Sequence, residues 1–232
     1  MLGYDWRFAP SWRLKAEAYY QYLYDVPVER TPSGFSMLNV GATFGFPEKT
    51  DLVNEGTGSN RGIELTLEKF FGKGTYLLTT ASIFDARYKG SDGIERNTAF
   101  NNRAVFNVLG GREWKVGRNG RNAFTVDIKA AFSGGRYYTP ADLAASLAAD
   151  EEKLDESRYN SERLSNYFRL DTRFGLRLNS ARRKLSHTLY IDFQNITNNQ
   201  NVLMQRYNTA KNAVGQAYRV GFFPDLLYRV QF

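Results

Sequence analysis

Apolar and polar residues alternate along most of this chain with a period of two, which is the period of a β-strand whose two faces meet different surroundings. At the end of the chain, Leu226, Tyr228, Val230 and Phe232 fall on one face, and mostly polar residues fall on the other. After an incomplete first strand that ends near Phe8, the alternation predicts strands over residues 11–24, 60–70, 75–88, 99–116, 122–137, 166–179, 186–196 and the last residues of the chain.

The links between these strands alternate in length. Short turns are expected at residues 9–10, 71–74, 117–121 and 180–184, and longer loops at 25–58, 89–98, 138–165 and 197–221. Within the third loop, residues 140–155 predict a short helix with Thr139 as its cap and Pro140 in its first position. Gly110 and Gly111 are expected to mark a bulge or kink in their strand.

This pattern predicts an all-β fold. Bacterial outer-membrane barrels have short periplasmic turns, long extracellular loops and strands with one apolar and one polar face. We therefore expect an antiparallel transmembrane β-barrel segment of about eight complete strands, formed as one unit by residues 1–232, in the outer membrane of a Gram-negative cell. The alternative is a soluble antiparallel sandwich or barrel, which strands of this length with aromatic ends and charged opposite faces do not favour.

Alternation also predicts which face of each strand meets lipid. The even-numbered residues from Tyr76 to Tyr88 have aromatic ends and a small middle, and they resemble a lipid-facing stripe. The charged residues of the strands are expected to face the lumen, where opposite charges on neighbouring strands can pair. These residues include Asp85, Arg87, Asp127, Lys129, Arg173 and Asp192.

Composition narrows the range of functions. The mean hydropathy is −0.50, and no apolar run approaches the ~18 residues that a transmembrane helix needs. The chain has no Cys and a single His187, which we expect at the membrane interface and not as a catalytic base. The net charge is +7, but Lys and Arg are dispersed, so nucleic acid is not an expected partner. We expect no cofactor, no metal and no enzymatic activity.

Five stretches resemble the C-terminal barrel segment of TonB-dependent receptors from Bacteroidetes-type bacteria. They are TDLVNEGTGSNRGIELTLEKFFGKGTYLL (50–78), YKGSDGIERNTAFNNR (88–103), RYYTPADL (136–143), DFQNITNNQNV (192–202) and GFFPDLLYRVQF (221–232). The resemblance implies a barrel of about 22 strands around a plug domain, which imports a scarce nutrient such as a siderophore, cobalamin or glycan. Plug, TonB box and signal peptide are not seen in these residues and are expected upstream.

The resemblance also implies partners: outer-membrane lipid, the TonB complex through the upstream region, and the outer-membrane assembly machinery. The machinery is expected to read the last strand, with Tyr228, Val230 and Phe232 as its signal. A small-molecule or glycan ligand is expected to contact aromatic residues in and beside the long loops. These residues are Tyr24, Phe35, Phe44, Tyr137, Tyr138, Tyr159 and Tyr207. The alternatives are an outer-membrane barrel enzyme and a passive pore or structural barrel.

Overall fold

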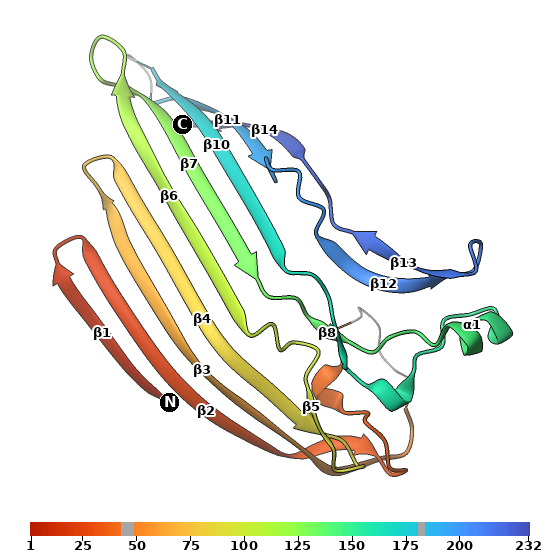
Figure 1. Cartoon of the computed structure of the whole chain (residues 1–232). Helices are drawn as coiled ribbons and strands as arrows, with labels where there is room; N and C mark the ends of the chain where they lie inside the picture. Colours follow the sequence, from red (N-terminus) through yellow and green to blue (C-terminus); the bar gives the residue numbers. More distant parts are fainter. Residues whose placement is uncertain (43–48, 181–183) are drawn as a thin grey trace.

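The structure is a computed structural model that describes residues 1–42, 49–180 and 184–232, and it is built on one large, curved antiparallel sheet (Figure 1). In this described part of the chain, nine long strands cross the sheet in chain order. They are β1 (Leu2–Ala9), β2 (Trp12–Glu29), β3 (Leu52–Gly72), β4 (Thr75–Lys89), β6 (Ala104–Val116), β7 (Asn122–Ser133), β10 (Tyr167–Asn179), β11 (Ser186–Gln194) and β14 (Phe223–Gln231). The all-β prediction and the succession of strands are confirmed.

The connections lie at two ends of the sheet, which we call the turn end and the loop end. Short links at the turn end include Lys73 and Gly74, whose positive φ values of 52° and 75° suit the two-residue hairpin between β3 and β4. The loop end carries the smaller elements (Figure 1). They are η1 (Met37–Asn39), β5 (Glu95–Asn97), β8 (Tyr137–Tyr138), α1 (Leu143–Ala149), η2 (Glu156–Arg158), β9 (Glu162–Arg163), β12 (Val202–Asn208) and β13 (Ala213–Tyr218).

Several predicted boundaries at the loop end were wrong. β2 continues to Glu29 and β3 already begins at Leu52, so both strands extend into the predicted 25–58 loop. The helix covers only Leu143–Ala149, and Asp142 caps it, because the Asp142 carboxylate accepts the amide of Ala145 at 3.0 Å. The predicted 197–221 loop contains the β12–β13 hairpin. Strand pairing extends β2 and β3 and forms the β12–β13 hairpin, whereas a local side-chain cap at Asp142 fixes the start of the helix.

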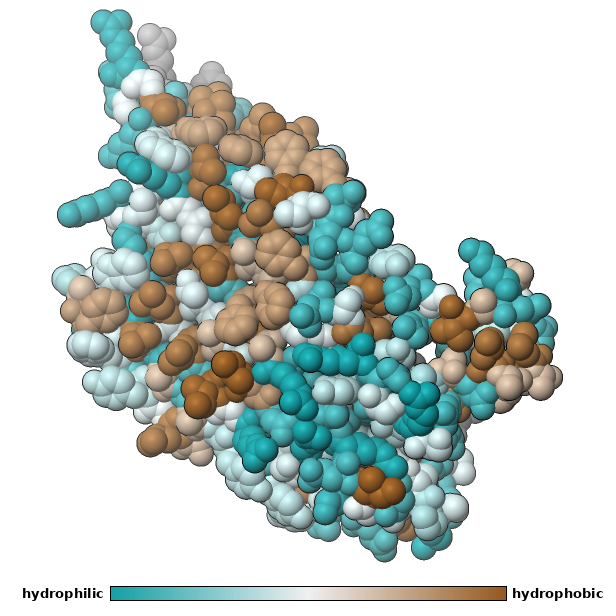
Figure 2. All heavy atoms as spheres, in the orientation of Figure 1, coloured by the Kyte–Doolittle hydropathy of each residue, from teal (hydrophilic) through white to brown (hydrophobic). Residues whose placement is uncertain are grey.

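The register gives the sheet one apolar and one polar face, because residues directly opposite each other in an antiparallel pair lie on the same face. One row of cross-strand partners on the apolar face is Tyr4, Ala16, Leu65, Ala81, Phe106, Phe132 and Phe168. One row on the polar face is Tyr76, Gly111, Asp127, Arg173, Asp192 and Asp225. Figure 2 shows apolar side chains gathered over the strands on one face of the molecule, with a more hydrophilic loop end.

The register corrects the facing predicted for β4. Ile83 pairs with Ile63, so the odd-numbered residues of β4 lie on the apolar face, and the even-numbered ones from Tyr76 to Tyr88 lie on the polar face. Asp85 and Arg87 are odd-numbered, so they lie on the apolar face near its loop end and not on the polar face as predicted. The error arose because both parities of β4 contain apolar and small residues, and only its partner strands determine its orientation.

The glycine pair in β6 does not form the predicted bulge, since the register with β4 and β7 is unbroken there. Gly111 is instead a site of close approach on the polar face. A Cβ at this position would lie 2.0 Å from Asp127 Oδ1 and 2.5 Å from Tyr76 Cε1. The missing side chain leaves room for the Tyr76 hydroxyl to donate to Asp127 Oδ1 at 2.7 Å. Bulges occur elsewhere, including the one in β2 between Leu23 and Val26.

The main cluster of buried apolar side chains lies at the loop end. Asp25 adopts φ 55° at the β2 bulge, and Val26 and Val28 after it are buried. Tyr88 of β4 is 1% exposed and donates through its hydroxyl to the carbonyl of Gly34 at 2.8 Å. Long-range packing therefore anchors the loop that follows β2 to the sheet. None of the helices in the described residues combines the length and apolar content needed to cross a membrane.

Candidate functional site

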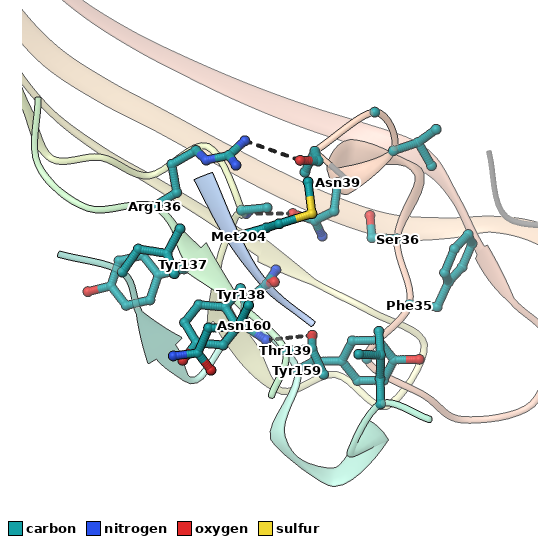
Figure 3. A pocket seen from close by; sticks show the side chains of 18 of the residues that line it. Phe35, Ser36, Asn39, Arg136, Tyr137, Tyr138, Thr139, Tyr159, Asn160 and Met204 are labelled. Carbon is teal, nitrogen blue, oxygen red and sulfur yellow. Dashed lines mark hydrogen bonds between the residues drawn. The ribbon is translucent and has the colours of Figure 1, made fainter. Parts of the chain in front are cut away.

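Three chain segments at the loop end form most of the wall of a half-open cavity of about 420 Å³, which we call the loop cavity (Figure 3). The segments are the loop after β2, the long connection between β7 and β10, and strand β12. The lining is mainly apolar and aromatic, with a few polar groups, which is typical of a small-molecule site. Its side chains include Phe35, Ser36, Asn39, Arg136, Tyr137, Tyr138, Tyr159, Asn160, Leu203 and Met204.

Arg136 joins the three segments. Its guanidinium donates to the carbonyl of Ala42 at 3.1 Å and to the carbonyl of Leu203 at 3.0 Å. Burial, together with the nearby positive charge of Arg219, lowers the pKa of Arg136, but an arginine remains protonated in proteins. Among the described residues no carboxylate forms an ion pair with Arg136. The cavity wall therefore carries a positive charge that is held by two backbone carbonyls.

Two consecutive tyrosines follow Arg136 on β8. Tyr137 and Tyr138 pair with Arg163 and Glu162 of β9, so a two-residue ladder fixes the backbone of both tyrosines. Arg163 also lies over the Tyr137 ring, with its Cζ 5.8 Å from the ring centroid. Burial raises the pKa of Tyr138, and the negative charge of Glu162 adds to this effect. Tyr138 is therefore a neutral phenol at neutral pH, and the pairing with β9 holds the backbone of both tyrosines in place.

Tyr159 packs against the opposite side of the cavity. A Cβ on Gly34 would lie 2.5 Å from Tyr159 Cδ2, so the tyrosine ring rests directly on the Gly34 backbone. Burial, followed by the negative charge of Glu156, raises the pKa of Tyr159. The next residue, Asn160, donates through its amide N–H to Thr139 Oγ1 at 3.1 Å and through Nδ2 to Asn97 O at 3.1 Å. Tyr159 is therefore held between two loops.

The structure brings together four of the seven predicted ligand contacts: Phe35, Tyr137, Tyr138 and Tyr159 line the loop cavity. Tyr207 lies beside it but is buried, and its backbone N–H donates to Glu152 Oε1 at 2.9 Å. Tyr24 is 71% exposed on β2, away from the cavity. Phe44 lies outside the described residues.

Sequence reasoning missed the polar residues of the cavity, and three of them show why. Arg136 and Asn160 come from the long connection between β7 and β10, and Asn39 comes from η1. The signal that points to Arg136 is its position directly before two tyrosines in RYYTPADL. The partners of Asn39 and Asn160 lie in segments far away along the chain, and no local pattern marks them.

A second cavity of about 350 Å³ lies against the polar face between β4, β7, β10 and β11. Its charged residues mostly pair with one another. Arg173 binds Asp192 through two hydrogen bonds, with distances of 2.5 and 2.7 Å, and Arg169 donates to Asp171 at 2.6 Å. The predicted cross-strand pairing of charges thus occurs between Arg173 and Asp192, and the wall is close to electrically balanced.

The remaining candidate groups have local partners. His187 Nδ1 lies 2.5 Å from the hydroxyl of Tyr228, and their rings stack with centroids 6.0 Å apart. Tyr228 and Val230 face the same side of β14 and pair with Leu189 and His187, as the alternation predicts. In the part of the chain that the structure describes, no group of three or more acidic or histidine side chains could hold a metal ion.

Comparisons with known proteins add no assignment: no protein-family model matches the chain, and no curated protein matches it. The functional proposal therefore rests on the geometry of the sheet and of the loop cavity, together with the sequence motifs.

Proposed function

We propose that this chain forms part of the outer-membrane β-barrel of a TonB-dependent receptor that imports a scarce nutrient of the siderophore, cobalamin or glycan class. The observation that carries the proposal is the division of the sheet. A mainly apolar face extends across nine long strands of the described residues, the opposite face is polar, and short turns at one end contrast with a cavity-bearing loop end. This combination is typical of outer-membrane barrels.

The size of the apolar face supports a lipid environment. Large apolar side chains of every long strand are exposed on it, including Trp6, Ile63, Ile83, Phe106 and Leu176. Monomeric soluble proteins rarely expose a contiguous apolar patch of more than a few hundred Å². In a bilayer, acyl chains would cover these side chains.

Strand β2 has the dimensions of a membrane-crossing strand. Trp12 lies near the turn end and Tyr20 and Tyr22 towards the loop end, with Leu14 and small residues between them on the same face. About ten residues at ~3.3 Å per residue and a tilt of about 40° span ~25 Å, which is the height of the apolar band of such barrels. The aromatic residues would then lie at the two membrane interfaces.

The edges of the sheet support a larger barrel. In the described residues, β1 and β14 form the two edges, and each has one side without a strand partner. Exposed edges of this length favour pairing with further strands. In the proposed receptor, neighbouring strands of the same barrel would cover both edges and close the cylinder around a plug domain.

The loop cavity supports ligand capture on the outer surface. Its volume of about 420 Å³ lies in the range of small-molecule sites. Tyrosine rings such as those of Tyr137 and Tyr138 can stack on the apolar faces of sugars or aromatic ligand groups, while the asparagine and arginine side chains of the cavity provide polar contacts. Import would then follow from rearrangement of the plug, driven through TonB.

The test uses the full-length polypeptide in its native cell. We expect it in the outer-membrane fraction, and we expect nutrient uptake to stop when TonB is deleted. Tyr159→Ala should weaken ligand binding about tenfold or more, because a ring on the cavity wall is lost, while Tyr24→Ala outside the cavity should have little effect. Uptake that continues without TonB would instead identify a passive pore, and a protein in the soluble fraction would contradict the membrane assignment.

A further inference from the structure

Two basic residues lie on the apolar face near the turn end. Lys69 pairs with Trp12 and Leu77, and Arg112 pairs with Thr75 and Val126, so the register places both on the face that carries the large apolar side chains. A charged group on a lipid-facing surface is costly unless its charged end reaches the membrane interface or finds a partner. These two positions therefore require an explanation that the barrel fold alone does not provide.

Both side chains are directed towards the turns. Lys69 Nζ donates to the carbonyls of Thr75 at 3.0 Å and Gly72 at 3.4 Å, and it also contacts the Thr75 hydroxyl. The guanidinium of Arg112 lies over the ring of Trp114, 5.1 Å from its centroid, and Trp114 is two residues closer to the turn. Because Arg112 is also the cross-strand partner of Thr75, the two cations flank one threonine.

Neither cation is neutralised. Among the described residues, no carboxylate lies within ion-pair distance of Lys69 or Arg112. The nearby acidic residues point to the polar face, where Glu113 pairs with Arg177 and Glu68 with Arg13. The described residues of the turns add only positive charge, with Lys73, Arg118, Arg121 and Lys184.

The loop end of the same face shows the contrast. Arg61 and Arg87 lie on the apolar face at the loop end, but both form ion pairs with Asp85, at 3.3 and 3.1 Å. Cations of the apolar face thus have a carboxylate partner at the loop end, whereas Lys69 and Arg112 have none among the described residues at the turn end. The unbalanced end is complementary to an anion that approaches from the lipid side.

We propose that Lys69 and Arg112 bind the phosphate of an anionic glycerophospholipid at the turn end of the sheet, with Trp114 packed beside its acyl-glycerol region. This inference rests on the proposed membrane location. The Arg112 guanidinium supplies charge-assisted hydrogen bonds to the phosphate oxygens, the Lys69 ammonium adds its positive charge while its N–H groups stay bonded to the turn, and the neighbouring apolar side chains contact the acyl chains. Binding is specific to this patch because it combines two cations with an apolar surface.

The experiment measures bound lipid directly. Full-length protein is reconstituted in nanodiscs of phosphatidylcholine with a minor fraction of phosphatidylglycerol, and the retained phosphatidylglycerol is counted by native mass spectrometry. Lys69→Gln and Arg112→Gln should each lower retention roughly fivefold, and the double variant roughly 25-fold. Arg61→Gln is the matched control, since it removes a cation of the same face at the loop end, and it should leave retention unchanged. Arg112→Lys should retain most of the binding.

The outcomes separate this inference from the proposed function. Wild-type protein that enters the nanodiscs but shows equal retention in all variants overturns the lipid site alone. Displacement of the lipid by excess inorganic phosphate overturns it too, because the site would then recognise a free anion. Wild-type protein that does not enter a bilayer at all contradicts the proposed membrane function itself.

Discussion

The adjacent glycines of β6 provide a sharp test of the facing of the sheet. Gly111 lies on the polar face, where a Cβ would come within 2.0 Å of Asp127 Oδ1 and 2.5 Å of Tyr76 Cε1. Gly110 lies on the apolar face, where the nearest atoms to a Cβ are Leu77 Cδ1 at 3.3 Å and Tyr76 O at 3.5 Å. Alanine at position 111 must displace the Tyr76 ring, whereas alanine at position 110 needs only a small shift of the flexible Leu77 side chain.

The two substitutions should therefore differ in their effect on the free energy of unfolding. Displacement of the Tyr76 ring by overpacking costs about 1–3 kcal/mol. Loss of the hydrogen bond from Tyr76 to Asp127 adds about 1 kcal/mol, a low value because both groups are half-buried. The alanine itself stabilises a strand by about 0.5–1 kcal/mol relative to glycine. Gly111→Ala should then destabilise by about 1–3 kcal/mol, while Gly110→Ala should be neutral or slightly stabilising.

The assay is equilibrium unfolding by urea of the full-length protein folded into lipid vesicles. A second-site control makes the reasoning specific: in a Tyr76→Ala background the Asp127 carboxylate can rotate away, so Gly111→Ala should cost little more than Gly110→Ala. Equal destabilisation by the two alanines would refute the facing that the register assigns. An unchanged cost of Gly111→Ala without the Tyr76 ring would refute the role of that ring.

Two further predictions concern the sheet and the loop end. Leu176→Arg, on the apolar face, should destabilise the folded protein by about 2–4 kcal/mol if it lies near the bilayer midplane. Arg173→Leu, on the polar face, should cost less. Folding titrations in lipid that show the reverse order would contradict the facing of the sheet. In the loop after β4, the hydrogen bonds from Arg96 lower the pKa of Asp92 below its ordinary value of 3.8. These bonds therefore stabilise the folded loop fully at pH values above 3.8, and the stabilisation is lost as the pH falls through the lowered pKa. The protection of this loop against hydrogen exchange, relative to the intrinsic rate at each pH, should fall on acidification, and in Asp92→Asn this protection should be low and independent of pH over that range.

Much of the sheet could be predicted because each strand carries its own signal. β10 alternates cleanly, with Phe174 and Leu176 on one face and Arg173 and Arg177 on the other, and its facing in the structure is as predicted. β4 has no such contrast, since Leu77 and Ile83 of one parity compete with Tyr76 and Phe84 of the other. Its orientation depends on the partner strands, and a pattern read one strand at a time does not contain that information.

The loop cavity was less accessible to sequence reasoning. Phe35, Tyr138 and Tyr159 were recognisable as aromatic residues in long loops, but nothing local indicated that they meet. Arg136 shows why: its two carbonyl partners, Ala42 and Leu203, lie 94 and 67 residues away along the chain. The residue that joins the three segments is defined by long-range contacts, and a single sequence gives no measure of them.

The position of the cavity follows from the way in which β2 and β3 end. After the bulge at Asp25, Val28 is fully buried and lies so close to Gly56 that any Cβ there would be 2.4 Å from its Cγ1. This apolar contact, with Tyr88 bound to the Gly34 carbonyl, fixes the loop after β2 against the polar-face side of the sheet. Tyr159 then packs on Gly34, so the cavity wall is built on the ordered ends of strands and not on loops alone. In the proposed receptor this arrangement would preorganise the ligand site and lower the entropy cost of capture.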